Sequence, residues 1–422
     1  MNKALLISTA QVYAAKLSIV IVGFFIVAGL ARTIEPSTLG DYFWLLSFAT
    51  VMAVLLRFGR DNSLVKQLTN ISHTQQYSTV YAALKVVFGF SALYLVVIAL
   101  LFFGGYLSSL ELTLCIAALP PFIAVVSVFG YWAQATKRPA LQQFIGAAPR
   151  MLSGAAVLIG VWLFGEVVPL LLALALSALV CSLVCLAYLV YARPSDAAQQ
   201  QVFDTQTQRE APKYHRYLTI ALCSTMMLEG SVLLAGWFTS ADEVAKLAIV
   251  VRIVSVVSFV LLAFNAVLMP EFAVLAKKAE KRQLTALFQK SRTVSLCCAL
   301  VVALFVFAIH KPVLQFFGEF FESSDVILLV LIAVQIMKVV VGPTGQLLMM
   351  SGYEQIQRNS LMVSVLCLVL CSAWLIPLQG ALGAANALFI AVALNNLLGL
   401  YYCVKYHQVP WLPFVKVREQ QP

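Results

Sequence analysis

The chain has 422 residues, of which 62% are hydrophobic and 11% are charged. An ordinary soluble domain carries about 25% charged residues, so this composition excludes that class. The apolar residues form repeated runs of about 20, the length an α-helix needs to cross a bilayer, whereas a membrane barrel would show alternating runs of about ten. The sequence therefore predicts an all-α polytopic membrane protein.

Twelve apolar segments are expected to be transmembrane helices, six on each side of a polar, glutamine-rich stretch. Their approximate ranges are 10–31, 42–58, 80–103, 110–135, 143–164, 167–191, 217–238, 245–269, 293–309, 326–350, 358–377 and 381–403. Lys16 interrupts the first run, which favours a retained helix over a cleaved signal peptide. We expect an N-terminal six-helix bundle at 1–191, a cytoplasmic linker at 192–216, a second bundle at 217–403 and a cytoplasmic tail at 404–422.

Basic residues determine the expected orientation. An even number of helices places both termini on one side. If that side is the cytoplasm, inner loops, ends and helix mouths hold 20 of the 28 Lys and Arg residues, while outer loops hold three: Arg32, Lys246 and Lys311. Cytoplasmic loops of membrane proteins are enriched in Lys and Arg, so we predict cytoplasmic termini. The net charge of +10 reflects this bias and does not indicate a nucleic-acid partner.

Several charges fall inside the predicted helices. We predict Lys16, Arg57, Arg60, Arg150, Arg252 and Lys338 as substrate-binding residues, with Arg57 and Arg60 at the inner mouth; Glu229 is the carboxylate within this set. A charge within a membrane costs at least about 2.5–3.5 kcal/mol, which usually marks a functional position. One carboxylate cannot neutralise four deep cations, so an anion such as pyrophosphate is expected. For each cation alone, a structural or snorkelling role is the alternative.

Glu229 admits two interpretations. It pairs with Lys338 or Arg252 and fixes one state of a transport cycle, or it titrates and couples export to protons, because burial and neighbouring charges shift a carboxyl pKa. Neither cofactor nor metal is expected. The nine cysteines lie in or at the ends of apolar runs, without a Cys-x-x-Cys or Cys/His cluster.

The segment 326–350 contains a helix break at Gly342, Pro343 and Gly345. Membrane helices tolerate such breaks against other protein or a cavity. We predict that the helix bends at Pro343 and turns Gln335, Lys338, Gly342 and Gly345 towards the cavity, because their spacing places them on one helical face. The alternative is that Lys338 pairs with an internal carboxylate and Pro343 is a packing kink.

Two loops bear on function. The stretch 272–292 alternates basic residues with leucines, which favours a short amphipathic helix on the inner membrane surface over a solvated basic loop. No expected outer loop is longer than 310–325, which leaves no room for a soluble catalytic domain, so we expect no enzyme activity.

Three stretches of the sequence resemble the polysaccharide flippases of the multidrug/oligosaccharidyl-lipid/polysaccharide superfamily. They are Leu30-Ala31-Arg32 with Pro36 and Leu39-Gly40-Asp41-Tyr42; the run from Leu56 to Lys66; and Gly342-Pro343-Thr344-Gly345 with Ser351-Gly352-Tyr353-Glu354 and Ile376-Pro377-Leu378-Gln379-Gly380. The second half departs from the pattern, because Ala245-Lys246-Leu247 stands where the first half has Gly40-Asp41-Tyr42.

The resemblance implies two six-helix bundles around a central cavity, and alternating access that moves an isoprenoid-pyrophosphate-linked oligosaccharide across the bacterial inner membrane. It implies cavity cations on the first, second and eighth helices, where Lys16, Arg57 and Arg252 stand. The expected partners are an undecaprenyl-pyrophosphate-type lipid-linked oligosaccharide and membrane lipids, with a polysaccharide polymerase and a chain-length regulator as further candidates.

Two other functions stay open. A multidrug exporter of the same fold is the first, although such a pump would favour a pocket rich in carboxylates. A membrane-embedded polysaccharide polymerase is the second, and the short outer loops disfavour it.

Overall fold

The computed structural model describes residues 3–68, 71, 73–106, 109–136, 138–164, 169–191, 214–255, 257, 275 and 281–411, and within these ranges the regular structure is helical, without strands. The chain forms two compact units, Met1–Thr225 and Met226–Pro422. Helix α9 (Tyr214–Phe238) begins in the first unit and ends in the second.

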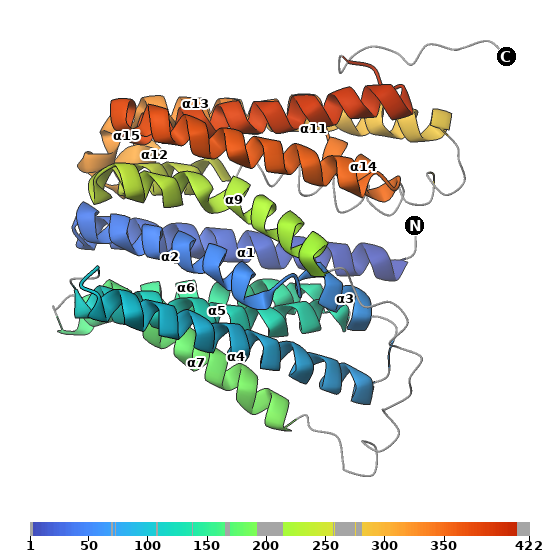
Figure 1. Ribbon diagram of the computed structural model, residues 1–422. Coiled ribbons are helices and arrows are strands. Elements are labelled where there is room, and N and C mark those ends of the chain that lie inside the picture. Colours follow the sequence, from blue (N-terminus) through green and yellow to red (C-terminus); the bar gives the residue numbers. More distant parts are fainter. Residues whose placement is uncertain are drawn as a thin grey trace. The chain divides into compact units, whose positions relative to one another are not determined.

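The first unit is built around α5 (Figure 1). Its elements are α1 (Lys3–Thr33), α2 (Pro36–Arg57), α3 (Asn62–Leu68), α4 (His73–Phe103), α5 (Leu110–Ala135), α6 (Pro139–Phe164), α7 (Leu170–Tyr191) and the start of α9. Helix α5 packs against α2, α3, α4, α6 and α7, while α1 packs mainly against α6. An added Cβ on Gly154 of α6 would lie 2.2 Å from Ile26 of α1, so a small residue permits this close helix approach.

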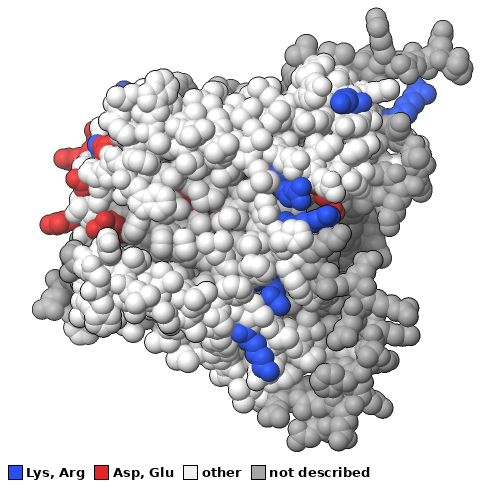
Figure 2. All heavy atoms as spheres, in the orientation of Figure 1, with Lys and Arg blue, Asp and Glu red and all other residues white. Residues whose placement is uncertain are grey.

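The second unit contains the remainder of α9, helical residues 241–255, α11 (Lys281–Ala308), α12 (His310–Phe317), the 3₁₀ helix η2 (Glu319–Ser324), α13 (Asp325–Val341), α14 (Thr344–Met350) and α15 (Glu354–His407). Helix α13 packs against α11 and α15, and α14 packs against α15. Figure 2 shows acidic side chains gathered at the left end of the view. Glu319 and Glu322 of η2 are exposed.

Helix α15 is a hairpin rather than one long rod. It covers 54 residues, and Gly380 interrupts it with φ 58° and ψ −134°. A straight helix of that length would separate its ends by about 80 Å. Instead, the rings of Tyr353 and Tyr406 at the two ends stack with centroids 4.5 Å apart. The chain therefore reverses at Gly380, and the two arms match the separate segments predicted at 358–377 and 381–403.

The all-helical membrane fold predicted from the sequence is confirmed. Ten described helices are long and apolar enough to cross a membrane, and counting the two arms of α15 separately gives eleven. The segment predicted at 245–269 is helical up to residue 255 and at 257, and its other residues lie outside the described part of the chain. The linker predicted at 192–216 lies outside it up to residue 213, and the predicted tail does so from residue 412.

The surface helix predicted at 272–292 is wrong for its second half. Residues from Lys281 onward belong to the 28-residue helix α11, and Leu284 and Phe288 are buried in a core cluster with Leu347 and Leu348 of α14. The leucines of this stretch thus pack against protein rather than lipid. Apart from Leu275, residues 272–280 lie outside the described part of the chain.

Candidate functional site

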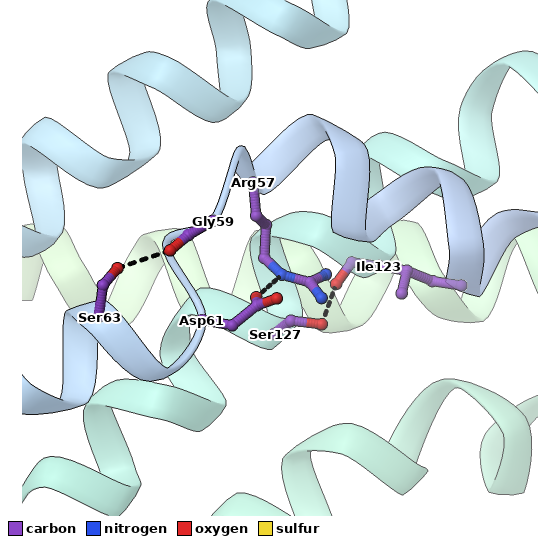
Figure 3. Close-up of polar contacts among 6 residues, drawn as sticks. All are labelled: Arg57, Gly59, Asp61, Ser63, Ile123 and Ser127. Carbon is purple, nitrogen blue, oxygen red and sulfur yellow. Dashed lines mark hydrogen bonds and ion pairs between the residues drawn. The ribbon is translucent and has the colours of Figure 1, made fainter. Parts of the chain in front are cut away.

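Arg57 lies in a sharp elbow between α2 and α3. The backbone leaves α2 through Phe58 and Gly59, both with positive φ (45° and 73°), and this turn brings Asp61 back beside Arg57 (Figure 3). Arg57 Nε donates to Asp61 Oδ1 at 2.5 Å, and both side chains are about 95% buried. The guanidinium group also lies 5.9 Å from the centre of the Tyr131 ring on α5. Asp61, which lies beyond the predicted segment 42–58, therefore neutralises this predicted site residue.

Arg60, at the same elbow, lies over an aromatic ring. Its guanidinium carbon is 4.5 Å from the centre of the Tyr214 ring, at the start of α9. Gln67 Nε2 donates to the Tyr214 hydroxyl at 3.3 Å, and an added Cβ on Gly59 would lie only 2.1 Å from the Tyr214 carbonyl oxygen. The elbow and the first turn of α9 thus form one packed junction, which the sequence did not predict.

Lys16 and Arg150 lie on neighbouring helices, α1 and α6. Lys16 is half-buried and Arg150 is exposed, and neither side chain forms a hydrogen bond or an ion pair with a described residue. Gly23 lies two turns from Lys16, and Gly146 one turn from Arg150, so each shares its cation's helix face. An added Cβ on either glycine would meet no atom within 4 Å. The space beside these two glycines is thus open, while Lys16 itself is half-buried and Arg150 is exposed.

Lys338 lies in the last turn of α13. It is half-buried, and its ammonium group has neither a hydrogen-bond nor an ion-pair partner among the described residues. Four residues later, Gly342 leaves the helix with φ 86°, Pro343 follows, and α14 begins at Thr344. The segment is thus broken into two helices.

The predicted common face of this segment does not continue across the break. An added Cβ on Gly342 would lie 3.0 Å from Arg292 Cγ of α11, and one on Gly345 would lie 3.1 Å from Gln357 Nε2 of α15. Both glycines pack against protein, so the prediction that they face a cavity is wrong. The positive φ of Gly342 removes the helical register on which that prediction relied.

Arg292 is a buried cation that sequence reasoning missed. It is 1% exposed. Its three nitrogen atoms donate to carbonyl oxygens of Val340 at 2.6 Å, Pro410 at 3.0 Å and Trp411 at 2.8 Å. The basic run around it suggested a surface position, and only the buried spacing of Leu284 and Phe288 along the same helix could have signalled otherwise.

Arg252 and Glu229 also belong to the second unit. Arg252 is half-buried and donates from Nη1 to the Ala248 carbonyl at 2.7 Å, one turn earlier in its helix. Glu229 is half-buried in α9, next to Gly230, which packs against Leu368 of α15. Among the described residues, no group of three or more His, Cys, Asp or Glu side chains could hold a metal ion.

Within each unit, the structure brings together some of the predicted residues. In the first unit, Arg57 and Arg60 meet at the elbow, and Lys16 and Arg150 lie on contacting helices. In the second unit, Lys338 lies beside the Gly342–Pro343 break. The cations thus divide into those already held by protein groups and those that have no such partner among the described residues.

Comparisons with known proteins agree with this helical architecture. The model of the family described as polysaccharide biosynthesis protein matches residues 2–276. No curated protein sequence matches the chain significantly. Among solved structures, the lipid II flippase MurJ in an inward closed conformation is similar with a TM-score of 0.65 and 12% identity, over 93% of this chain and 87% of that chain.

Multidrug transporters share the fold too. An inward-facing MATE family transporter of the MOP superfamily has a TM-score of 0.59 and 11% identity, over 94% of this chain and 98% of that one. A mutant of the Vibrio cholerae MATE transporter VcmN has a TM-score of 0.54 and 15% identity, over 95% and 97%. These similarities show the two-bundle transporter fold, and the family match shows that the chain is a multi-pass membrane protein of the polysaccharide biosynthesis protein family.

Proposed function

We propose that the chain is a flippase for isoprenoid-pyrophosphate-linked oligosaccharide repeat units. It moves them by alternating access from the cytoplasmic to the outer leaflet of the bacterial inner membrane, for O-antigen or capsule synthesis. The family match and the fold shared with a lipid II flippase support this proposal. No bond is made or broken in such a movement, so the proposed protein is not an enzyme.

One observation carries the proposal. Lys16, Arg150 and Lys338 lie in membrane-spanning helices, and none of their side chains has an ion-pair or hydrogen-bond partner among the described residues. Charges inside membranes are costly unless they meet water, protein groups or a ligand. A pyrophosphate supplies several anionic oxygens, which Arg binds through two parallel hydrogen bonds and Lys binds as a point charge. An anionic headgroup therefore suits these three residues.

The other predicted residues take secondary roles in the proposal. Arg60 and Arg252 add positive potential along the path, beside the Tyr214 ring and the Ala248 carbonyl. Arg57, paired with the buried Asp61, holds the elbow that carries Arg60. Glu229 acts as a coupling or ion-pairing carboxylate. The Gly342–Pro343 break ends α13 within one turn of Lys338.

The proposed substrate is an undecaprenyl-pyrophosphate-type lipid whose tail stays in the bilayer, with a polymerase and a chain-length regulator as further partners. The proposed arrangement has bundles at 1–191 and 217–403 around a central cavity, a linker at 192–216, and both termini in the cytoplasm.

Alanine substitutions test the cationic site. Lys16→Ala, Arg150→Ala and Lys338→Ala should each reduce surface polysaccharide at normal protein abundance. Lys85→Ala is the matched control for the two lysines, because Lys85 is also a helix lysine but is exposed, with its Nζ 4.8 Å from the ring centre of Tyr81, whereas Lys16 and Lys338 are half-buried. If all three variants make as much surface polysaccharide as the control, the cationic site is wrong.

Multidrug export is the second candidate, supported by the MATE structures of the same fold. Such a protein would change drug susceptibility when deleted. A deletion strain with altered drug susceptibility and normal surface polysaccharide would favour this candidate over the flippase.

A further inference from the structure

Arg292 connects three parts of the second unit around the helix break. Nε donates to the carbonyl of Val340, in the last turn of α13, while Nη1 and Nη2 donate to the carbonyls of Pro410 and Trp411. The methylene groups of the same side chain pack against Gly342, where an added Cβ would lie 3.0–3.3 Å from them. One side chain thus contacts α13, the break and the segment 408–411 that follows α15.

The position of Arg292 is unusual for a cation. It is 1% exposed, and its guanidinium donates to three neutral carbonyls. The last four carbonyls of a helix lack partners within the helix, and the helix dipole places negative charge there. A buried guanidinium at this point both satisfies the Val340 carbonyl and favours the end of α13 at Val341.

The segment 408–411 is itself fixed in the unit. Val409 is 1% exposed in the core cluster formed by α11, α14 and α15. Thr285 of α11 donates to the His407 carbonyl at 3.0 Å, and Ser351 Oγ lies 2.9 Å from His407 Nε2. Arg292 therefore connects the end of α13 to a segment that is packed in the core rather than to an exposed tail.

We propose that Arg292 is a positioning residue for substrate binding. By tying the end of α13 to the segment 408–411, it fixes where the helix breaks and so fixes Lys338, which lies two residues before Val340. Arg292 does not touch the substrate. This inference rests on the proposed function, because Lys338 is taken there as a contact for the pyrophosphate.

The test is binding of undecaprenyl pyrophosphate to the purified full-length protein in lipid nanodiscs. Arg292→Met and Lys338→Met should each weaken the Kd about tenfold, the effect of one lost hydrogen bond to a charged group. The double variant should bind no more weakly than Lys338→Met alone, because Arg292 acts through Lys338. Arg292→Lys retains the charge, yet one ammonium group cannot donate to all three carbonyls as the planar guanidinium does. The Kd of this variant should therefore also rise several-fold.

Thr285→Val is the matched control. It removes the hydrogen bond from the same helix to the His407 carbonyl and keeps the three hydrogen bonds of Arg292, so it should leave the Kd unchanged even where it lowers stability. Where Arg292→Met does not fold, Arg292→Lys decides the test.

The outcomes separate the two proposals. Wild-type Kd values for the Arg292 variants, with a weakened Lys338→Met, would overturn the positioning role alone. A double variant weaker than Lys338→Met would show that Arg292 acts independently of Lys338 and would overturn it as well. An unchanged Kd for Lys338→Met would overturn the role of Lys338 in the proposed function, and the inference with it.

Discussion

The cations differ in what balances their charge. Arg57 has a buried carboxylate, Arg292 has three carbonyls, and Lys338 has no hydrogen-bond or ion-pair partner among the described residues. The sequence placed all three near the membrane but could not sort them, because the partners depend on turns and on tertiary contacts. Asp61 reaches Arg57 only because Phe58 and Gly59 adopt left-handed backbone conformations.

Asp61→Asn should strongly destabilise the protein. The change removes the negative charge and leaves Arg57 buried without it, and breaking a buried pair in this way costs about 3–5 kcal/mol. Unfolding of the purified protein in detergent measures the loss. Glu111→Gln is the control, because Glu111 is exposed in the first turn of α5. Equal stability of the two variants would show that the Arg57–Asp61 pair is unimportant for folding.

At the scale of elements, three glycines with positive φ set the helix ends. Gly59 forms the α2–α3 elbow, Gly342 ends α13, and Gly380 turns the α15 hairpin. The sequence predicted the break at Gly342 and two segments on either side of Gly380. It could not show that residues from Lys281 extend α11, because an amphipathic pattern is the same whether its apolar side meets lipid or protein.

Gly59→Ala should destabilise the first unit more than Gly105→Ala. Both glycines have positive φ (73° and 78°), which costs a residue with a side chain about 1–2 kcal/mol. The new Cβ at position 59 would also collide with the Tyr214 carbonyl, whereas at position 105 it would meet nothing within 4 Å. The difference in unfolding temperature between the two variants measures the cost of this collision. The same loss in both would mean that the elbow does not pack closely against α9.

Glu243 should stabilise the α15 hairpin through its hydrogen bond rather than its charge. Its Oε2 accepts from the Ala381 N–H at 3.0 Å, while its ion pair with Lys246 is 20–30% exposed and so contributes little. Glu243→Ala should cost about 1–3 kcal/mol, because the N–H loses its acceptor, and Glu243→Gln should cost clearly less. Resistance to limited proteolysis and unfolding temperature compare the variants. An equally large loss in Glu243→Gln would assign the effect to the ion pair instead.

At the scale of the whole molecule, the hydropathy pattern predicts most of the fold. Apolar runs of membrane length identify the helices because each must satisfy its backbone groups internally. The short elements α3, α12 and η2 were not predicted, since they are too short to produce a hydropathy signal. The site was less predictable. Residue types showed a cationic interior, but only the structure separates Lys16, Arg150 and Lys338 from cations held by protein groups.

We propose that this family member flips a lipid-linked oligosaccharide. The most direct test is the leaflet in which lipid-linked repeat units lie when the protein is depleted, measured in spheroplasts with a membrane-impermeant reagent that labels sugars. We predict that repeat units accumulate and stay protected from the reagent until the membrane is permeabilised, and that the wild-type gene, but not the Lys16→Ala/Lys338→Ala variant, restores labelling. Repeat units labelled in intact spheroplasts to the same extent with and without the protein would contradict the claim.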